Sequence, residues 1–133
     1  MKQSIIILTA FFFACTPPHS QMATSNKTEK LLLNKWIPVE YVIDEKQYPI
    51  EERRQNDFLE LLPNHEKNER FHGKKVKGSW EYLPHGNFIM IYGPKKWIYV
   101  PARVVSISDE WLKIITYDVK SGKFIISVYK AGK

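Results

Sequence analysis

Residues 77–93 read KGSWEYLPHGNFIMIYG, and this stretch decides the fold. Residues 84–87, PHGN, carry the turn formers Pro, Gly and Asn, and runs rich in aromatic and aliphatic residues flank them on both sides. In the second run Ile89 and Ile91 lie two positions apart, so they project from the same face of a strand. Two strand-like runs joined by a short turn predict a β-hairpin.

The same alternation of turn and strand signals continues through the chain. Turn-forming clusters recur at 63–65, 84–87, 93–94, 108–110 and 120–123. The runs between them predict strands over 35–43, 57–62, 75–83, 87–92, 96–107, 110–117 and 123–130, with 68–72 as a further one. No long helical pattern alternates with these strands, which argues against a parallel dinucleotide-binding sheet. Consecutive short strands favour an all-β, antiparallel up-and-down β-barrel of about eight strands, or a sandwich.

Three segments qualify this pattern. Pro101 has no N–H to donate to a sheet, so we expect the strand over 96–107 to bend or split there. Residues 50–57, IEERRQND, lack an apolar stripe and predict a loop or a single helical turn. Residues 124–126, FII, are apolar on both faces of their strand. We expect one of these faces on the core and the other partly covered or contacting a partner.

The N-terminal residues have the pattern of an export signal. Lys2 precedes an apolar run over 5–14, which is too short to cross the roughly 30 Å of bilayer hydrocarbon. Cys15 follows this run and is the one cysteine of the chain, so it has no partner for an intramolecular disulfide. The stretch 1–15 resembles a bacterial lipoprotein signal that ends in Ala14-Cys15.

This resemblance implies that residues 1–14 are a lipoprotein signal peptide and that Cys15 is acylated, for example with palmitate. The acyl chains would then hold the protein at a membrane. Residues 15–29 would form the lipidated cysteine and a flexible polar tether, and residues 30–133 the folded domain. We expect an anchor in the outer membrane, facing the periplasm. Ordinary cleavage with a spare thiol at Cys15 is the alternative.

The bulk composition is that of one globular domain. Hydrophobic residues make up 44% of the chain and charged residues 26%, which excludes a disordered or collagen-like chain. The formal net charge is +6, but the basic residues are spread out and no run of five occurs. Because no nucleic-acid recognition motif accompanies this charge, we expect a solvated basic surface and no nucleic-acid partner.

Residue types that carry catalysis or bind metals are scattered along the chain. The sequence has no Gly-x-Ser-x-Gly elbow and no glycine-rich phosphate loop. His19 lies in the predicted tether, and His65, His72 and His85 fall in predicted turns or loops without metal-ligand spacing. We therefore expect no enzymatic activity, no metal and no cofactor.

Large aromatic side chains are the strongest candidates for binding. The candidate contacts to a ligand or partner are Trp36, Trp80, Tyr82, Trp97 and Tyr99. The first two also fit as core residues at the base of a barrel. Trp97 follows two lysines beside the turn at 93–94, so we expect it at a rim, in contact with an anionic or aromatic ligand or another protein. Tyr99 lies two residues on, on the same strand face.

Four stretches carry a resemblance to a known family. They are LLLNKWIPVEYV (31–42), DFLELLPNHEKNE (57–69), the hairpin at 77–93 and RVVSISDEWLKIITYD (103–118). In order and spacing they resemble the lipocalin-like domain of small bacterial lipoproteins. One departure is Asn34-Lys35, where that family prefers a Gly before its first Trp. The resemblance implies an antiparallel barrel of about eight strands with a shallow cup, and short strands with four Trp favour a mostly filled interior.

Three classes of function remain open. The first, which we favour, is a membrane-anchored lipoprotein whose barrel binds a small hydrophobic or aromatic ligand in a cavity with a few polar groups. The alternative is a protein–protein interaction module with a filled barrel, such as an inhibitor, an immunity protein or an envelope-assembly accessory protein. A periplasmic enzyme would instead need clustered titratable groups in a cleft.

Overall fold

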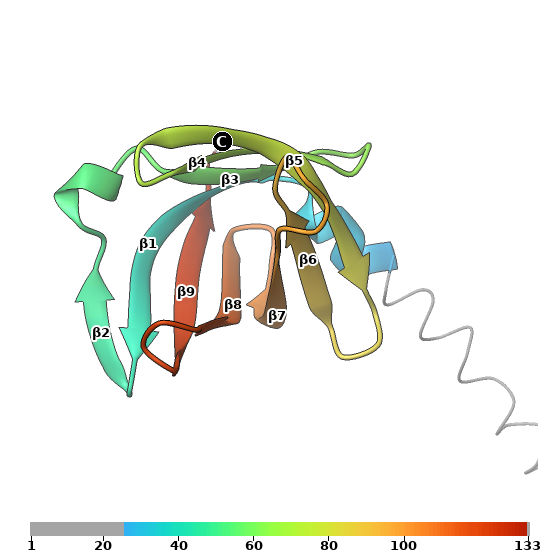
Figure 1. Cartoon of the computed structure of the whole chain (residues 1–133). Helices are drawn as coiled ribbons and strands as arrows, with labels where there is room; N and C mark the ends of the chain where they lie inside the picture. The colour runs from blue at the N-terminus through green and yellow to red at the C-terminus, as the bar shows by residue number, and fades with distance from the viewer. Residues whose placement is uncertain (1–25, 133) are drawn as a thin grey trace, which may run out of the picture.

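The computed structural model describes residues 26–132, which form a β-barrel and a short helix over 26–32 (Figure 1). Runs rich in Ile, Val, Tyr and Trp form most of the strands, as the β propensity of these residues predicts. The elements are β1 (Lys35–Ile43), β2 (Lys46–Pro49), the 3₁₀ turn η1 (Glu52–Arg54), β3 (Phe58–Leu61), β4 (Glu66–Phe71), β5 (Lys74–Leu83), β6 (Phe88–Tyr92), β7 (Tyr99–Ile107), β8 (Trp111–Asp118) and β9 (Lys123–Ala131).

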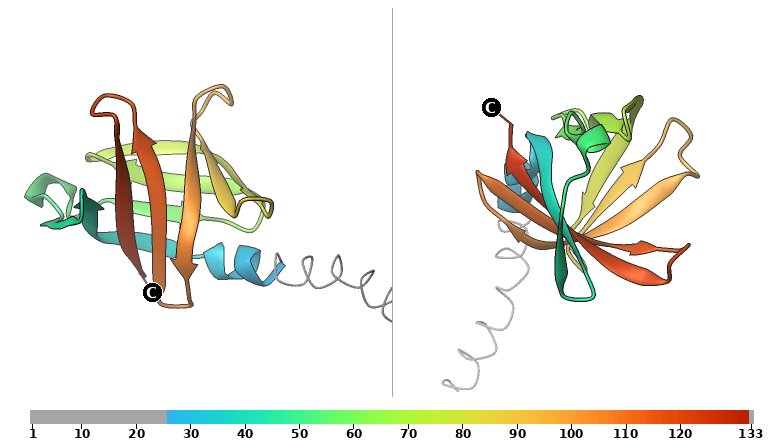
Figure 2. Two further views of the ribbon diagram at one scale, coloured as in Figure 1. Left: turned by 90° about the horizontal axis from the view of Figure 1, so that it is seen from below. Right: turned by 90° about the vertical axis from the view of Figure 1, so that its left-hand side faces the viewer.

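The sheet closes on itself through β1. One edge of β1 pairs with β3 at Lys35 and Trp36, and the other edge pairs with β9 from Trp36 to Val42. The eight strands β1 and β3 to β9 thus form a closed antiparallel barrel, and β2 is an extra strand paired with β1. In the left view of Figure 2, β7 to β9 cross β3 to β5 at a steep angle. The prediction of an all-β antiparallel barrel of about eight strands is confirmed.

One end of the barrel is filled by packed side chains. Trp36 is fully buried, and its indole N–H donates to the carbonyl of Leu32 in the helix at 3.0 Å. Trp80 is 1% exposed and donates in the same way to the carbonyl of Leu62, also at 3.0 Å. Both buried indoles therefore keep a partner for their polar atom. The remaining buried apolar residues are Leu32, Leu59, Leu61, Ile89, Ala102, Val104, Leu112 and Ile114.

The two ends of the barrel differ in their connections. Because consecutive strands are antiparallel, the turns after β3, β5 and β7 lie at the filled end, near the helix over 26–32. The loops after β4, β6 and β8 lie at the opposite end. The turn after β3 contacts the helix directly, since His65 Nε2 lies 3.1 Å from Glu29 Oε1. The helix thus caps the filled end and leaves the other end open.

The hairpin predicted from residues 77–93 is formed by β5 and β6. Gly86 and Asn87 in its turn have φ angles of 84° and 59°, a region that Gly enters freely and Asn more easily than most residues. The Asn87 side chain accepts a hydrogen bond from Tyr82 Oη at 2.5 Å and donates to the carbonyl of Val104 at 3.0 Å. The turn chemistry that identified this hairpin in the sequence therefore also ties it to β7.

The strand predicted over 96–107 differs from β7 in two ways. It begins at Tyr99, because residues 93–98 form the loop after β6. It does not split at Pro101, which pairs with Met90 of β6 inside a continuous strand. The pairing of β7 with β8 starts only at Arg103, so the opposite side of Pro101 faces no ladder that its missing N–H would break.

The structure also differs from the sequence predictions in the tether and at β2. The helix over 26–32 begins inside the segment 15–29, whereas the rest of that segment and the predicted signal peptide lie outside the described residues. The strand Lys46–Pro49 was not predicted, while the single turn expected within 50–57 is formed by η1. No helix in the described part of the chain is long and apolar enough to cross a membrane.

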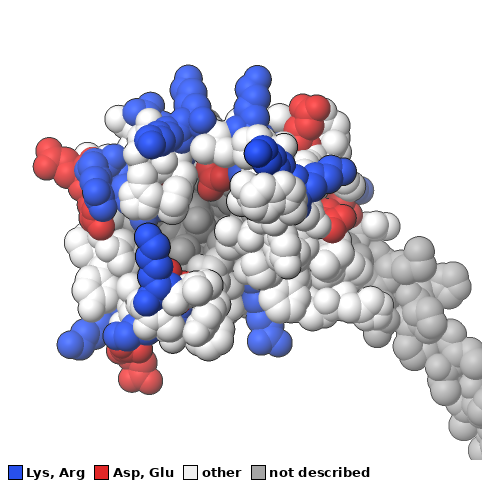
Figure 3. All heavy atoms as spheres, in the orientation of Figure 1, with Lys and Arg blue, Asp and Glu red and all other residues white. Residues whose placement is uncertain are grey.

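Basic side chains are distributed unevenly over the barrel. Figure 3 shows Lys and Arg side chains crowding the upper edge of the molecule, where β4 and β5 run in Figure 1. β5 alone carries three exposed lysines, Lys74, Lys75 and Lys77. On this face of the molecule, basic side chains thus gather along β4 and β5.

Candidate functional site: a cup at the open end

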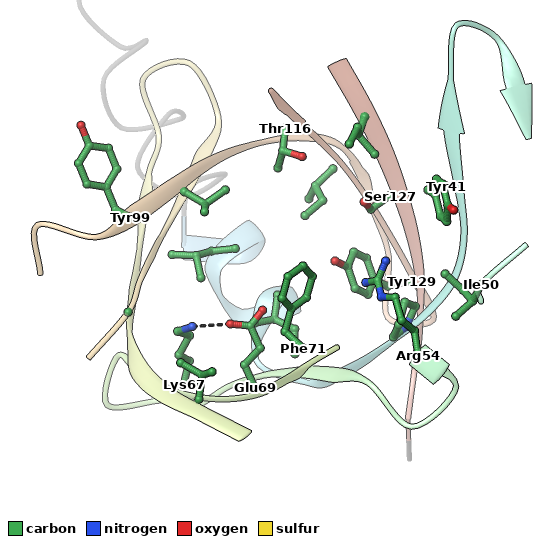
Figure 4. Close-up of a pocket in the computed structure, with 18 of the residues that line it drawn as sticks. Tyr41, Ile50, Arg54, Lys67, Glu69, Phe71, Tyr99, Thr116, Ser127 and Tyr129 are labelled. Atoms are coloured by element: carbon green, nitrogen blue, oxygen red, sulfur yellow. Dashed lines mark hydrogen bonds and ion pairs between the residues drawn. The ribbon is translucent and has the colours of Figure 1, made fainter. Parts of the chain in front are cut away.

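The open end of the barrel holds a cavity of about 530 Å³, which we call the cup (Figure 4). Strands from all around the barrel contribute side chains to it, and the helix over 26–32 lies behind it in Figure 4. The expectation of a mostly filled barrel therefore holds for the end with Trp36 and Trp80 and is wrong for the other end. The apolar wall is formed by Leu59, Phe71, Val76, Ile91, Ile98, Val100, Ile114 and Ile125.

The floor of the cup carries an ion pair from β4. Period-two alternation turns Lys67, Glu69 and Phe71 toward the inside of the barrel. The Lys67 side chain is 2% exposed, and its Nζ donates to Glu69 Oε1 at 2.5 Å. Figure 4 marks this contact with a dashed line inside the barrel. A buried ammonium needs a charged partner, and Glu69 supplies it.

Gly78 makes room for Lys67 beneath the cup. The two residues face each other across the β4–β5 pair. A Cβ added at Gly78 would lie 2.8 Å from Lys67 Cε and 2.1 Å from the carbonyl oxygen of Tyr92. Both distances are shorter than van der Waals contact, so this position requires glycine for the close approach of side chain and backbone.

Hydroxyl groups from β8 and β9 complete the polar part of the lining. Tyr129, Ser127 and Thr116 all line the cup, and Figure 4 places Tyr129 beside Ser127 and Arg54. Burial raises the pKa of Tyr129 to about 12, and the negative charge of Glu69 adds to the rise. Tyr129 is therefore a neutral hydroxyl at physiological pH, able to donate or accept a hydrogen bond.

Arg54 and Asp57 fix the loop that borders the cup on the β2–β3 side. Asp57 accepts hydrogen bonds from Arg54 Nε at 3.0 Å and from the backbone N–H groups of His72 at 2.9 Å and Gly73 at 3.1 Å. Burial alone would raise the pKa of Asp57, but these hydrogen bonds to its charged form outweigh burial and lower the pKa. A buried carboxylate thus holds η1 against the β4–β5 turn, beside Phe71.

The residues predicted from the sequence divide between core, rim and cup. Trp36 and Trp80 belong to the filled end, and Tyr82 packs against that core. Trp97 is 73% exposed on the loop after β6, at the open end as expected of a rim residue, and it is not part of the cup lining. Tyr99 is the member of the predicted set that lines the cup.

Sequence reasoning missed the polar floor. Five of the six residues 66–71, EKNERF, are polar, and the strand predicted over 68–72 has no apolar face that would mark Lys67 and Glu69 as lining a cavity. One sequence signal for the floor is Gly78 in the Gly-x-Trp strand. This glycine pairs with Lys67 and leaves room for its long side chain inside the barrel. Recognising it requires the register between β4 and β5, which is a non-local property.

Together the fold and the cup define a small closed β-barrel with one filled end, one hollow end and an ion-paired floor. No protein-family model matches this sequence, and no curated protein is significantly similar to it. Within residues 26–132, no group of three or more His, Cys, Asp and Glu side chains lies together in a way that fits a metal ion.

Proposed function

We propose that the protein binds a small ligand with a hydrophobic or aromatic body and an oxygen-bearing head group inside the cup, without catalysing a reaction on it. The observation that carries this proposal is the combination of an apolar-walled cavity of about 530 Å³ with one buried ion pair at its floor. Small-molecule sites typically have volumes of about 300–1,000 Å³, mostly apolar walls and a few convergent polar groups.

The floor accounts for the choice of head group. The Lys67 ammonium has three N–H donors, and within residues 26–132 its hydrogen-bond partner is Glu69. An oxygen atom of a ligand can accept from the remaining donors, while the Tyr129 hydroxyl lines the same cavity. A ligand without such an atom would leave the Lys67 donors desolvated, which costs about 1–3 kcal/mol.

The hollow end favours ligand binding over the alternative of a protein–protein interaction module. That alternative predicts a filled barrel, whereas Val76, Ile91 and Ile125 line open space. The surface still offers exposed aromatic residues, for example Trp97, so protein contacts stay compatible with the proposal as an additional property.

We further propose that the barrel works at a membrane, as a lipoprotein anchored through acylated Cys15 in the outer membrane and facing the periplasm. This part of the proposal rests on the sequence of residues 1–29, with its apolar run, its one cysteine and its polar spacer. An anchored barrel would hold its ligand close to the bilayer from which an apolar molecule comes.

Native mass spectrometry of the protein purified from its own host envelope tests the ligand proposal. We expect a mass above that of the chain and its lipid, which disappears when the protein is denatured and corresponds to one small molecule per barrel. If the spectrum instead shows a bound protein and no small molecule, the proposal is contradicted and the interaction module is favoured.

A further inference from the structure

Two neighbouring connections at the mouth of the cup form one surface, which we call the basic rim and define as residues 71–75 and 94–99. The first segment is the turn between β4 and β5 with the strand ends beside it, and the second is most of the loop after β6 with the first residue of β7. Phe71 of the first segment lines the cup together with Pro94, Ile98 and Tyr99 of the second. The two segments therefore border the same mouth and form parts of a single rim.

The basic rim belongs to a region of one charge sign. Residues 70–80 and 90–108 together contain seven Lys and Arg and no Asp or Glu. Lys74, Lys75, Lys95 and Lys96 are exposed within the rim itself. Elsewhere the open end carries opposite charges in contact, as in the 2.6 Å pair between Lys123 and Asp44. The rim thus presents uncompensated positive charge to an approaching partner.

Large apolar side chains are exposed on the same rim. Trp97 is 73% exposed, Tyr99 54%, Phe71 49% and Ile98 48%. The Lys95 ammonium lies 5.7 Å from the Trp97 ring centre, so cation and aromatic surface form one unit. Apolar surface of this size in water is unfavourable, and its clustering at the mouth indicates a contact site. Phe71, Ile98 and Tyr99 also line the cup, so any partner at the rim faces its entrance.

We propose that the basic rim docks on the headgroup region of an anionic lipid bilayer. Aromatic side chains flanked by lysines are the composition that favours a membrane–water interface, with rings at headgroup level and ammonium groups on lipid phosphates. An acidic protein would satisfy the charge, but it would not by itself require so many protruding apolar side chains. Docking places the cup entrance against the bilayer and does not depend on which ligand the cup holds.

The proposed anchor is compatible with this orientation. The helix over 26–32 lies at the filled end, opposite the rim. Eleven peptide steps separate Asn26 from Cys15, a reach of up to about 37 Å when extended. The nine residues of β7 span about 30 Å. The intervening chain is therefore long enough for the rim to touch the bilayer that holds Cys15.

A site-specific polarity probe tests the proposal. In the full chain with Cys15→Ser, a single cysteine is introduced either at Lys96 in the rim or at His85 in the exposed turn at the filled end, and each is labelled with an environment-sensitive dye. The probes are vesicles of phosphatidylcholine alone and of equimolar phosphatidylcholine and phosphatidylglycerol. We expect a blue shift at position 96 with the anionic vesicles, little or none with the neutral ones, and none at position 85.

A variant with fewer rim lysines tests whether the rim, and not another part of the protein, contacts the membrane. Adding Lys74→Gln and Lys75→Gln should weaken the affinity for anionic vesicles, read from the titration of the shift at position 96, by about 25-fold. Each lysine near an anionic surface contributes about five-fold to that affinity. The proposal is overturned by an absent shift at position 96, or by equal shifts at positions 96 and 85. A shift at position 96 with soluble polyglutamate but not with anionic vesicles would also overturn it and assign the rim to an acidic protein.

Discussion

Lys67 and Glu69 lie two residues apart on β4, and both point into the barrel, where Lys67 Nζ donates to Glu69 Oε1 at 2.5 Å. Adjacent inward positions on one strand are usually apolar in a closed barrel of this size, because the interior is small. Here the pair forms the floor of the cup beneath a wall of aliphatic side chains. This arrangement gives the floor of the cup a fixed pair of opposite charges and leads to the first prediction.

Lys67→Met should destabilise the fold by about 3 kcal/mol, because it leaves the Glu69 carboxylate in the barrel without its cation. The double variant Lys67→Met, Glu69→Leu should recover most of that loss, since both charges are removed together. Urea unfolding measures both values. A double variant as unstable as the single one would mean that the two side chains are not energetically coupled.

Gly78→Ala should destabilise the fold by about 3 kcal/mol, because the new Cβ would collide with the carbonyl oxygen of Tyr92 and with Lys67. Ser79→Ala, at the neighbouring half-buried position, is the matched control and should change stability by less than about 1 kcal/mol. Thermal unfolding compares the two variants. Equal melting temperatures would show that β5 moves away from β4 at little cost.

Asp57→Asn should lower stability at neutral pH by about 2 kcal/mol, because it weakens the hydrogen bonds from Arg54, His72 and Gly73 to a charged acceptor. Since folding lowers the pKa of Asp57 below 3.8, its contribution is present above that pH and is lost as the pH falls through the lowered pKa. The stability difference between wild type and variant should therefore shrink in acid. A difference that stays constant with pH would rule out this linkage.

Cys15→Ala should move the protein from the membrane fraction to the soluble fraction of the host envelope, because the variant has no thiol to acylate. Fractionation followed by immunoblotting measures the distribution. Ser20→Ala, in the predicted tether, is the control and should leave the protein in the membrane fraction. If the Cys15→Ala protein stays with the membranes, the lipid anchor is wrong.

The barrel was predictable because its signals are local. The turn at 84–87 and the alternation of Ile89 and Ile91 specify one hairpin, and the same kind of signal recurs along the chain. The strand Lys46–Pro49 was missed because its exposed residues have little strand pattern of their own and depend on pairing with β1. Propensity cannot identify a strand that is held mainly by its neighbour.

The cup was less predictable than the barrel because it depends on register. Trp36 and Trp80 are candidate ligand contacts in the sequence but fit better as core residues, and pairing across the barrel places both at the filled end. Lys67 and Glu69 read as surface residues until closure of the sheet turns them inward. Whether a barrel end is hollow is set by which side chains meet across it, and a single sequence does not contain that information in local form.

The most direct test of the account compares Thr116→Trp with Tyr117→Trp in one binding measurement. Thr116 lines the cup, whereas its neighbour Tyr117 is 53% exposed on the outer face of β8. Calorimetric titration with anilinonaphthalene sulfonate uses a probe that has an aromatic body and an anionic head. We predict that wild type and Tyr117→Trp each bind one equivalent, and that Thr116→Trp loses about tenfold or more in affinity because the indole fills the cavity. A folded Thr116→Trp protein that binds the probe as tightly as wild type would contradict ligand binding in the cup.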